Sequence, residues 1–273
     1  MKFLKGLALA ILGFLLFLSL SIFGIVFMLN QTILNPDFVA SQVDRLDIAS
    51  LAKETIIQQM PQQPESVVKA VNDTIADLEP WLKQQTRDTI YSFYDYLEGR
   101  SQNLSLVVSL EPVKESLRKN LGQDEIYQQI SQQIPSTFEL SEASLGAKGM
   151  AQLEQVKQYI GYLHLAYNAL IGLILLLILL IIVIHRQVRG STRGLGTTFL
   201  SCGILSYAGA LVAKNVAGTQ LPQLNIPTYL QAWVPQLIAD TLAPLEIYGI
   251  ALLAVGVVLL VVSFVYKPRQ PSP

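Results

Sequence analysis

Few side chains in this chain have the types and spacing that catalysis needs. Paired carboxylates can act as a general acid and base, or they can hold a metal ion. Carboxylates this close in sequence are more typical of a solvated helix face, so we assign them no catalytic or metal-binding role. The close pairs are Asp44 with Asp47, Asp73 with Asp77, and Asp124 with Glu125.

The histidines and the single cysteine give no nucleophilic arrangement. Neither His164 nor His185 has a Ser, Asp or Cys partner at a suitable spacing. Cys202 lies in an apolar run, which blunts the reactivity of a thiol, and one cysteine cannot form an internal disulfide. Gly194-Leu195-Gly196 is not part of a phosphate-binding glycine motif. The sequence therefore predicts a protein that is not an enzyme and holds no cofactor or metal ion.

The composition places the chain in lipid. Of its 273 residues, 51% are hydrophobic and 14% are charged, whereas soluble domains carry about 25% charged residues. Four apolar runs are long enough for a bilayer, which a helix of about 20 residues crosses. These runs are residues 6–29, 165–184, 195–213 and 247–266.

The first run could instead be a cleaved signal peptide, because Lys2 and Lys5 precede it. The apolar part of a signal peptide has about 7–15 residues and ends at a small-residue cleavage site. The run over 6–29 is longer, and Met28-Leu29-Asn30 does not match such a site. We therefore predict an uncleaved signal anchor.

Basic residues beside the spans predict the orientation. The start of the chain, the link between the second and third spans and the tail contain seven basic and no acidic residues. Cytoplasmic loops of membrane proteins carry such an excess of Lys and Arg. Both termini are expected in the cytoplasm of a plasma-membrane protein, with residues 30–164 and 215–245 outside. The basic residues are Lys2, Lys5, Arg186, Arg189, Arg193, Lys267 and Arg269.

Residues 30–146 are expected to form a mostly helical extracytoplasmic domain with its own core. Pro36 predicts a helix start as a first-turn proline. One helix is expected over 64–78 and another from Pro80, which Gly99 ends in the left-handed conformation that glycine favours. The other expected helix starts are Asp47, Glu111 and Asp124.

One strand is expected in this domain, because apolar residues alternate with Ser105, Val107 and Ser109 at a period of two. A lone strand is marginally stable, so residues 136–140 are expected to pair with it. The alternating apolar residues are Leu104, Leu106, Val108 and Leu110.

Residues 147–186 are expected to form one helix that continues into the second span. Its apolar residues recur at spacings of three and four, close to a coiled-coil seam. The part outside the membrane would form a stalk, although the same stripe could belong to the core of the outer domain, and the two interpretations are compatible. The stripe is Met150, Leu153, Val156, Ile160 and Leu163.

The last part of the chain, residues 187–273, holds the third and fourth spans and the tail. Between these spans, residues 215–245 are expected to form an amphipathic outer loop, interrupted by prolines. A short helix there would lie on the membrane surface with Trp233 at the interface, or would cover the outer domain. Lys214 and Glu246 could pair across the span ends or simply extend towards water.

Small residues are expected to bring the spans together, because lipid gives helices no hydrophobic reason to associate. Spacings of seven place them on one seam of a left-handed bundle, and the third span carries the longest series. The small residues are Gly6 and Gly13, then Gly196, Gly203 and Ala210, then Gly249 and Gly256.

Three short segments resemble a set of uncharacterised prokaryotic membrane proteins that share one anchor, a helical outer domain and three further spans. That resemblance implies a bacterial or archaeal plasma membrane and carries no known activity. The sequons at Asn30, Asn72 and Asn103 would matter only in a eukaryotic secretory pathway. The three segments are Leu34-Asn35-Pro36-Asp37-Phe38, Tyr96-Leu97-Glu98-Gly99 and Leu110-Glu111-Pro112-Val113-Lys114.

A second resemblance is one of topology. The transmembrane subunits of mechanotransmission-type ABC systems also place an outer domain between the first two of four spans, which would imply coupling to a cytoplasmic ATPase. Residues 185–194 lack the coupling segment expected of that family.

The sequence therefore predicts a mainly α protein, with a four-helix transmembrane bundle and an inserted, mostly helical extracytoplasmic domain that has one or two short strands. This domain would bind an unidentified envelope or membrane protein, sense a signal or scaffold an assembly. The alternatives are a permease-like subunit of an ABC system and, less well supported, a membrane-tethered enzyme. The chain is expected to contact the lipid bilayer and not nucleic acid, because its basic segments are short and adjacent to the membrane.

Overall fold

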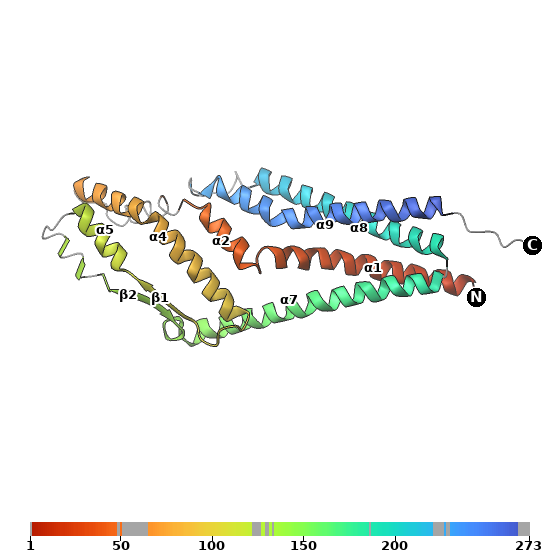
Figure 1. Ribbon diagram of the computed structural model, residues 1–273, viewed down its shortest axis with the longest axis horizontal. Coiled ribbons are helices and arrows are strands. Elements are labelled where there is room, and N and C mark those ends of the chain that lie inside the picture. Colours follow the sequence, from red (N-terminus) through yellow and green to blue (C-terminus); the bar gives the residue numbers. More distant parts are fainter. Residues whose placement is uncertain are drawn as a thin grey trace, which may run out of the picture. The chain divides into compact units, whose positions relative to one another are not determined.

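The computed structural model shows a mainly α chain, as predicted (Figure 1). The chain divides into two compact units. The span unit comprises Met1–Asn35, Tyr162–Ile226 and Val234–Pro273, and the inserted unit comprises Pro36–Gly161 and Pro227–Trp233. The residues that the structure describes are 2–47, 50, 65–121, 127–128, 131–132, 134–185, 187–220, 227 and 230–266.

Four helices are long and apolar enough to cross a membrane, which confirms the four expected spans. Their bounds are α1 (Lys2–Gln31), α7 (Glu142–His185), α8 (Val188–Gln220) and α9 (Trp233–Val265). Helix α7 has a non-helical residue at Gly146 and then continues to His185. The single helix expected from residue 147 is therefore present, and its residues up to Gly161 belong to the inserted unit.

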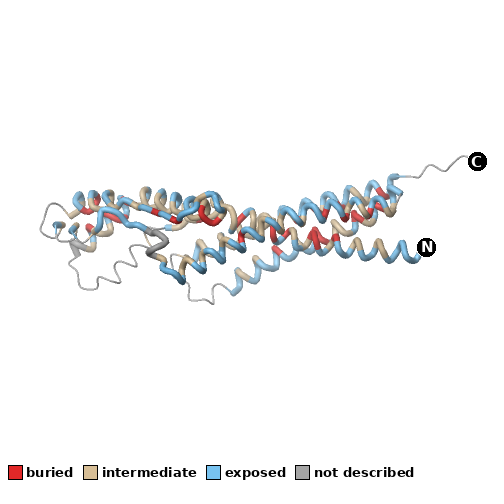
Figure 2. The backbone as a smooth tube through the Cα atoms, turned by 90° about the horizontal axis from the view of Figure 1, so that it is seen from below, coloured by how far each residue is buried: buried red, intermediate tan, exposed pale blue. Residues whose placement is uncertain are grey.

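The span unit has a narrow core and an apolar outside. Many large apolar side chains are exposed on the helix surfaces, for example Phe264 at 72% and Leu165 at 68%. Figure 2 shows this pattern as exposed stretches along these helices. A surface of this kind would be unstable in water but suits contact with lipid chains. The buried core residues come from all four helices and are Leu16, Leu20, Ile174, Leu177, Ile181, Leu195, Cys202 and Leu252.

The predicted glycine seam joins α8 to α9. A Cβ placed on Gly203 would lie 2.8 Å from the backbone oxygen of Gly249, and one on Gly249 would lie 2.8 Å from the backbone nitrogen of Tyr207. Further along the same seam, a Cβ on Gly256 would lie 2.8 Å from the backbone nitrogen of Leu200. The two backbones therefore touch where only glycine fits, as the spacing of seven predicted.

The seam expected for the first span is present only in part, since a Cβ on Gly13 would lie 4.0 Å from Oγ1 of Thr198 on α8. Among the described residues, a Cβ on Gly6 would meet nothing within 4 Å. One on Gly24 would lie 2.8 Å from a ring carbon of Tyr248. The Tyr248 hydroxyl donates a hydrogen bond to the carbonyl of Leu20 at 2.8 Å, so α1 packs through an aromatic side chain that a spacing rule for small residues could not anticipate. The ring of Phe23 packs beside it.

The loop expected between the third and fourth spans is shorter than predicted. Helix α8 continues to Gln220 and α9 starts at Trp233, so residues 215–220 and 233–245 extend the spans and form no separate surface helix. Pro235 is compatible with this because the amides of a first helical turn have no partner within the helix. The Trp233 indole donates to the carbonyl of Gln42 at 3.0 Å, and both residues belong to the inserted unit.

The inserted unit contains most of the expected helices. They are α2 (Pro36–Asp44), α4 (Glu65–Leu97), α5 (Glu111–Leu121) and the first part of α7. Asp47 acts as a cap, since its Oδ1 accepts from the amide of Ser50 at 2.9 Å. The body of the helix expected after Asp47, at residues 51–60, lies outside the described residues, as do most of the residues of the helix expected from Asp124.

Pro80 does not open a new helix, because α4 runs through it. A proline inside a helix loses one amide donor and disturbs the carbonyl four residues earlier. Pro80 and Ala76 are both exposed, so water can solvate that carbonyl, while Ile75 and Leu78 remain buried on the packed face. The ribbon of α4 changes direction along its length (Figure 1), which is the usual effect of an internal proline.

The expected strand pairing is confirmed. Strand β1 (Ser105–Ser109) pairs antiparallel with β2 (Thr137–Ser141), with Val108 opposite Phe138. Leu104 and Leu106 are buried and Val107 is 59% exposed, as the alternation predicted.

Candidate functional site

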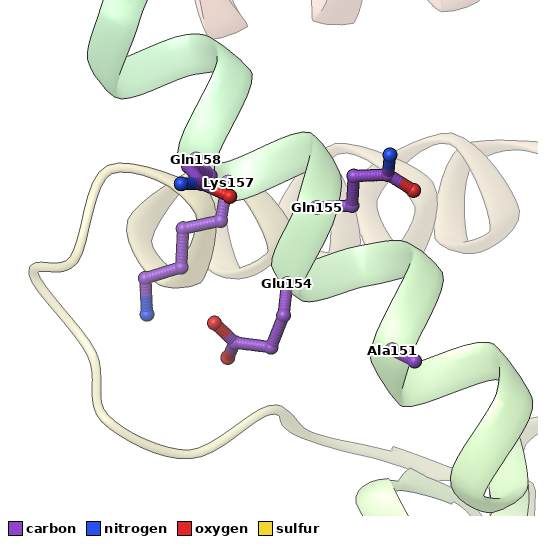
Figure 3. Close-up of a pocket in the computed structure, with 5 residues that line it drawn as sticks. All are labelled: Ala151, Glu154, Gln155, Lys157 and Gln158. Atoms are coloured by element: carbon purple, nitrogen blue, oxygen red, sulfur yellow. The ribbon is translucent and has the colours of Figure 1, made fainter.

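A polar pocket lies where the end of α4 meets the first part of α7. The Tyr96 hydroxyl donates to Oε1 of Glu154 at 2.6 Å, and Nζ of Lys157 lies 4.3 Å from the centre of the Tyr96 ring. Figure 3 shows the side chains of Glu154 and Lys157 directed to the same side of α7. The pocket has a volume of about 640 Å³ and is lined by Ala151, Glu154, Gln155, Lys157 and Gln158.

Local sequence explains this arrangement. Gly99, with φ of 77°, ends α4 just after Tyr96, and the amide of Arg100 donates to the carbonyl of Asp95 at 2.8 Å. The chain therefore turns sharply where α4 meets α7, and a Cβ on Gly99 would lie 4.0 Å from Cε of Lys157. Glu154 and Lys157 are three residues apart, which places them on one helix face.

The chemistry of this pocket is that of a structural connection. Tyr96 is 1% exposed, and a buried phenol hydroxyl needs a hydrogen-bond partner. Glu154 supplies it as a charge-assisted bond, and the Lys157 ammonium over the ring adds a cation–π contact. The three side chains hold α4 against α7, and the carboxylate is already engaged.

A second, apolar groove lies between α4, the two strands and the start of α5. Its volume is about 420 Å³. Phe138 on its rim is 54% exposed. The lining contains hydroxyl and amide groups but no Asp, Glu, His, Lys or Cys. The residues are Trp81, Leu82, Gln85, Thr86, Thr89, Val108, Leu110, Val113 and Phe138.

Polar contacts fix the edges of the groove. Nζ of Lys114 on α5 lies 3.1 Å from Oγ of Ser136 and 3.3 Å from Oε1 of Glu111. The bond from Ser136 and the pairing with Lys114 hold the pKa of Glu111 below its usual value. These contacts attach the start of α5 to the residue that precedes β2, and so position Phe138.

Strand β2 has a backbone edge beside the groove. The amide of Leu110 donates to the carbonyl of Ser136 at 2.8 Å. Hydrogen-bonded pairs alternate along an antiparallel ladder, so Phe138 bonds to β1 while Thr137 and Glu139 turn their backbone groups away. Within the described part of the chain the sheet has only these two strands, so no described strand pairs with the outer edge of β2.

The carboxylates noted in the sequence do not come together. Asp44 pairs with Arg87 of α4, and Asp47 caps Ser50. Asp77 pairs with Lys119 of α5 at 2.9 Å, and this bond lowers the pKa of Asp77. Among the described residues no three of His, Cys, Asp and Glu are placed to hold a metal ion. Asp73 is exposed, and Asp124 and Glu125 lie outside the described residues.

The histidines and the cysteine belong to the span unit and make contacts within it. The carbonyl of His164 accepts a bond from the Asn168 amide at 3.1 Å within α7. Cys202 is buried among the spans, with Sγ 3.6 Å from Oγ of Ser21. Lys214 and Glu246 form the expected ion pair, with Nζ and Oε1 2.7 Å apart.

Sequence reasoning missed both pockets. Tyr96 and Glu154 stand in different helices, and no local spacing connects them. The one signal was Phe138, which falls in the second expected strand and alternates there with Leu140.

The chain matches no protein-family model, no curated protein and no solved structure. The resemblance to prokaryotic four-span proteins therefore stays a prediction.

Proposed function

We propose that this multi-pass membrane protein binds a protein partner through its inserted unit and performs no catalysis. We further propose that it resides in the plasma membrane with both termini in the cytoplasm and the inserted unit outside. The four apolar helices support membrane embedding, and the segregation of basic residues supports the orientation.

The observation that carries the proposal is the apolar groove beside the β2 edge. Its volume of about 420 Å³ lies within the range of small-molecule pockets, about 300–1,000 Å³, and it would hold a few apolar side chains. An extended peptide could pair with the outer edge of β2 and place alternate side chains in the groove beside Phe138. In strand addition of this kind, backbone hydrogen bonds provide the affinity, and pockets for alternate side chains of the peptide provide the specificity.

The groove lining supports binding over catalysis. Its polar groups are the Gln85 amide, the hydroxyls of Thr86 and Thr89, and the indole N–H of Trp81. Such groups orient a ligand, but general acid–base catalysis needs a side chain that titrates near neutral pH.

In-cell photocrosslinking from the full-length protein tests this proposal. A photoreactive phenylalanine at Phe138 should give an adduct with one discrete envelope protein. The matched control is the same residue at Tyr159, an aromatic residue of the inserted unit that is 55% exposed and does not line the groove. The partner identified in this way should then bind the purified Phe138→Asp protein more weakly than the wild type. Equal adducts from both positions, or none from Phe138, would contradict the proposal.

A further inference from the structure

At one end of the span unit, the ends of the four spanning helices lie close to basic side chains. Nζ of Lys5 on α1 donates to the carbonyl of His185 at the end of α7, at 3.4 Å. On α9, Oγ of Ser263 donates to the carbonyl of Arg189 at 3.1 Å. These two contacts place the first turn of α1, the α7–α8 turn and the last turns of α9 at the same end (Figure 1).

The α7–α8 turn is closely packed at this end. The His185 ring lies on the face of α8 formed by Gly190 and Gly194, where a Cβ on Gly190 would collide with the ring and one on Gly194 would lie 3.6 Å from it. Nδ1 of His185 lies 3.3 Å from the carbonyl of Ile181. The backbone that carries Arg189 and Arg193 is therefore held in place.

No acidic residue balances the charge here. Residues 1–29, 165–239 and 247–273 contain no Asp or Glu. The side chains of Lys5, Arg189 and Arg193 are exposed, and the two arginines are one turn apart on α8. They also lie in the first turns of α8, where the helix dipole adds positive potential.

The surroundings identify a lipid as the source of the balancing charge. Arg193 is two residues before Leu195, which is buried in the bundle core, so the arginines stand at the edge of the apolar span. Beside Lys5, the apolar side chains of Phe3 and Leu4 are 82% and 69% exposed. A lipid could thus place its phosphate on the guanidinium groups and its chains along α1, which a soluble phosphate could not do.

We propose that this basic end, formed by Lys5, Arg189 and Arg193, binds the phosphate of an anionic phospholipid headgroup. Arginine suits the role because its planar fork donates two parallel hydrogen bonds to a phosphate. The site belongs to the span unit and stands whether or not the inserted unit binds a partner.

Native mass spectrometry of the full-length protein in detergent, titrated with phosphatidylglycerol or phosphatidylcholine, tests the proposal. The wild type should retain phosphatidylglycerol in preference to phosphatidylcholine. The Arg189→Gln/Arg193→Gln variant should bind phosphatidylglycerol about 10- to 30-fold more weakly, as expected for the loss of two surface charges near anionic lipid. Millimolar inorganic phosphate should not displace the lipid from the wild type.

Two further variants keep the test decisive. Arg189→Lys/Arg193→Lys preserves the charge but loses the planar fork, so its affinity should lie between those of the wild type and the Arg189→Gln/Arg193→Gln variant. Arg118→Gln/Lys148→Gln removes two exposed basic residues of the inserted unit and should change nothing. Equal lipid affinity for the wild type and the Arg189→Gln/Arg193→Gln variant, an equal loss in the Arg118→Gln/Lys148→Gln control, or full displacement by inorganic phosphate would overturn the proposal.

Discussion

Different kinds of contact stabilise the interior of each of the two units. In the span unit, glycines of α8 and α9 let the backbones touch, and large apolar side chains point outwards. In the inserted unit, polar pairs join the helices, including Tyr96 with Glu154 and Tyr91 with Asp37 at 2.7 Å. In lipid, moving an apolar side chain from the surface to the core gains no hydrophobic free energy, because the lipid chains are also apolar. Close packing between helices must therefore stabilise the fold. In water, burial supplies the stability and polar pairs select the arrangement.

The largest effect is expected from Gly203→Leu. The new side chain would start 2.8 Å from the backbone oxygen of Gly249, so α8 and α9 would have to separate. Overpacking usually costs about 1–3 kcal/mol and more where backbone must move, and we expect the upper end. The midpoint of thermal unfolding, followed by circular dichroism in micelles, measures it.

Gly209→Leu on the same helix is the matched control. Among the described residues a Cβ there would meet nothing within 4 Å, so this variant should unfold close to the wild type. Equal destabilisation by the two substitutions would show that the seam is not what holds α8 to α9.

A smaller effect is expected from Tyr96→Phe in the inserted unit. It removes the hydroxyl from a buried ring and leaves Glu154 without that donor, at a cost of about 1–2 kcal/mol. Tyr159→Phe is the control, because Tyr159 is 55% exposed and its hydroxyl bonds only to Gln155 among the contacts described. Chemical denaturation followed by the change in tryptophan fluorescence should separate the two variants, and indistinguishable midpoints would argue against Tyr96 as a connection between α4 and α7.

The smallest effect is expected from Asp77→Asn. It should appear as a change in how the free energy of unfolding depends on pH. The Lys119 bond lowers the pKa of Asp77 in the folded protein. A carboxyl group whose pKa falls on folding stabilises the folded state at every pH above its unfolded pKa of about 3.9. This stabilisation is lost as the pH drops through the lower pKa of the folded state. The stability difference between wild type and variant should be present at neutral pH and should fall as the pH drops below about 4 towards the folded value. A difference that persisted or grew in acid would refute the assignment.

Local patterns predicted much of the fold. The four spans, the seam of α8 and α9, the cap at Asp47 and the β1–β2 pairing depend on spacing along the chain. The errors arose where tertiary contacts decide. Pro80 is accepted because its disturbed backbone faces water. On α1 the close contact is at Gly24, which the spacing did not predict, because the Tyr248 ring packs there, whereas Gly6 meets nothing within 4 Å among the described residues.

The two pockets depend entirely on long-range register. The groove needs Trp81, Val108 and Phe138 around one space. The strand pairing, the Lys114–Ser136 bond and the packing of α4 on α5 and β1 bring these segments together. The pattern within a single segment does not show which distant segments will be in contact. The sequence therefore predicted a binding domain but not the residues of its binding surface.

Thiol labelling in intact cells tests the central claim that the inserted unit and the α7–α8 turn lie on opposite sides of a membrane. Gln102→Cys and Gln187→Cys replace the same residue type at two exposed positions, and the native Cys202 is buried. A membrane-impermeant maleimide should label the Gln102→Cys variant in intact cells, and should label the Gln187→Cys variant only after permeabilisation. Equal labelling of both variants in intact cells would contradict the account.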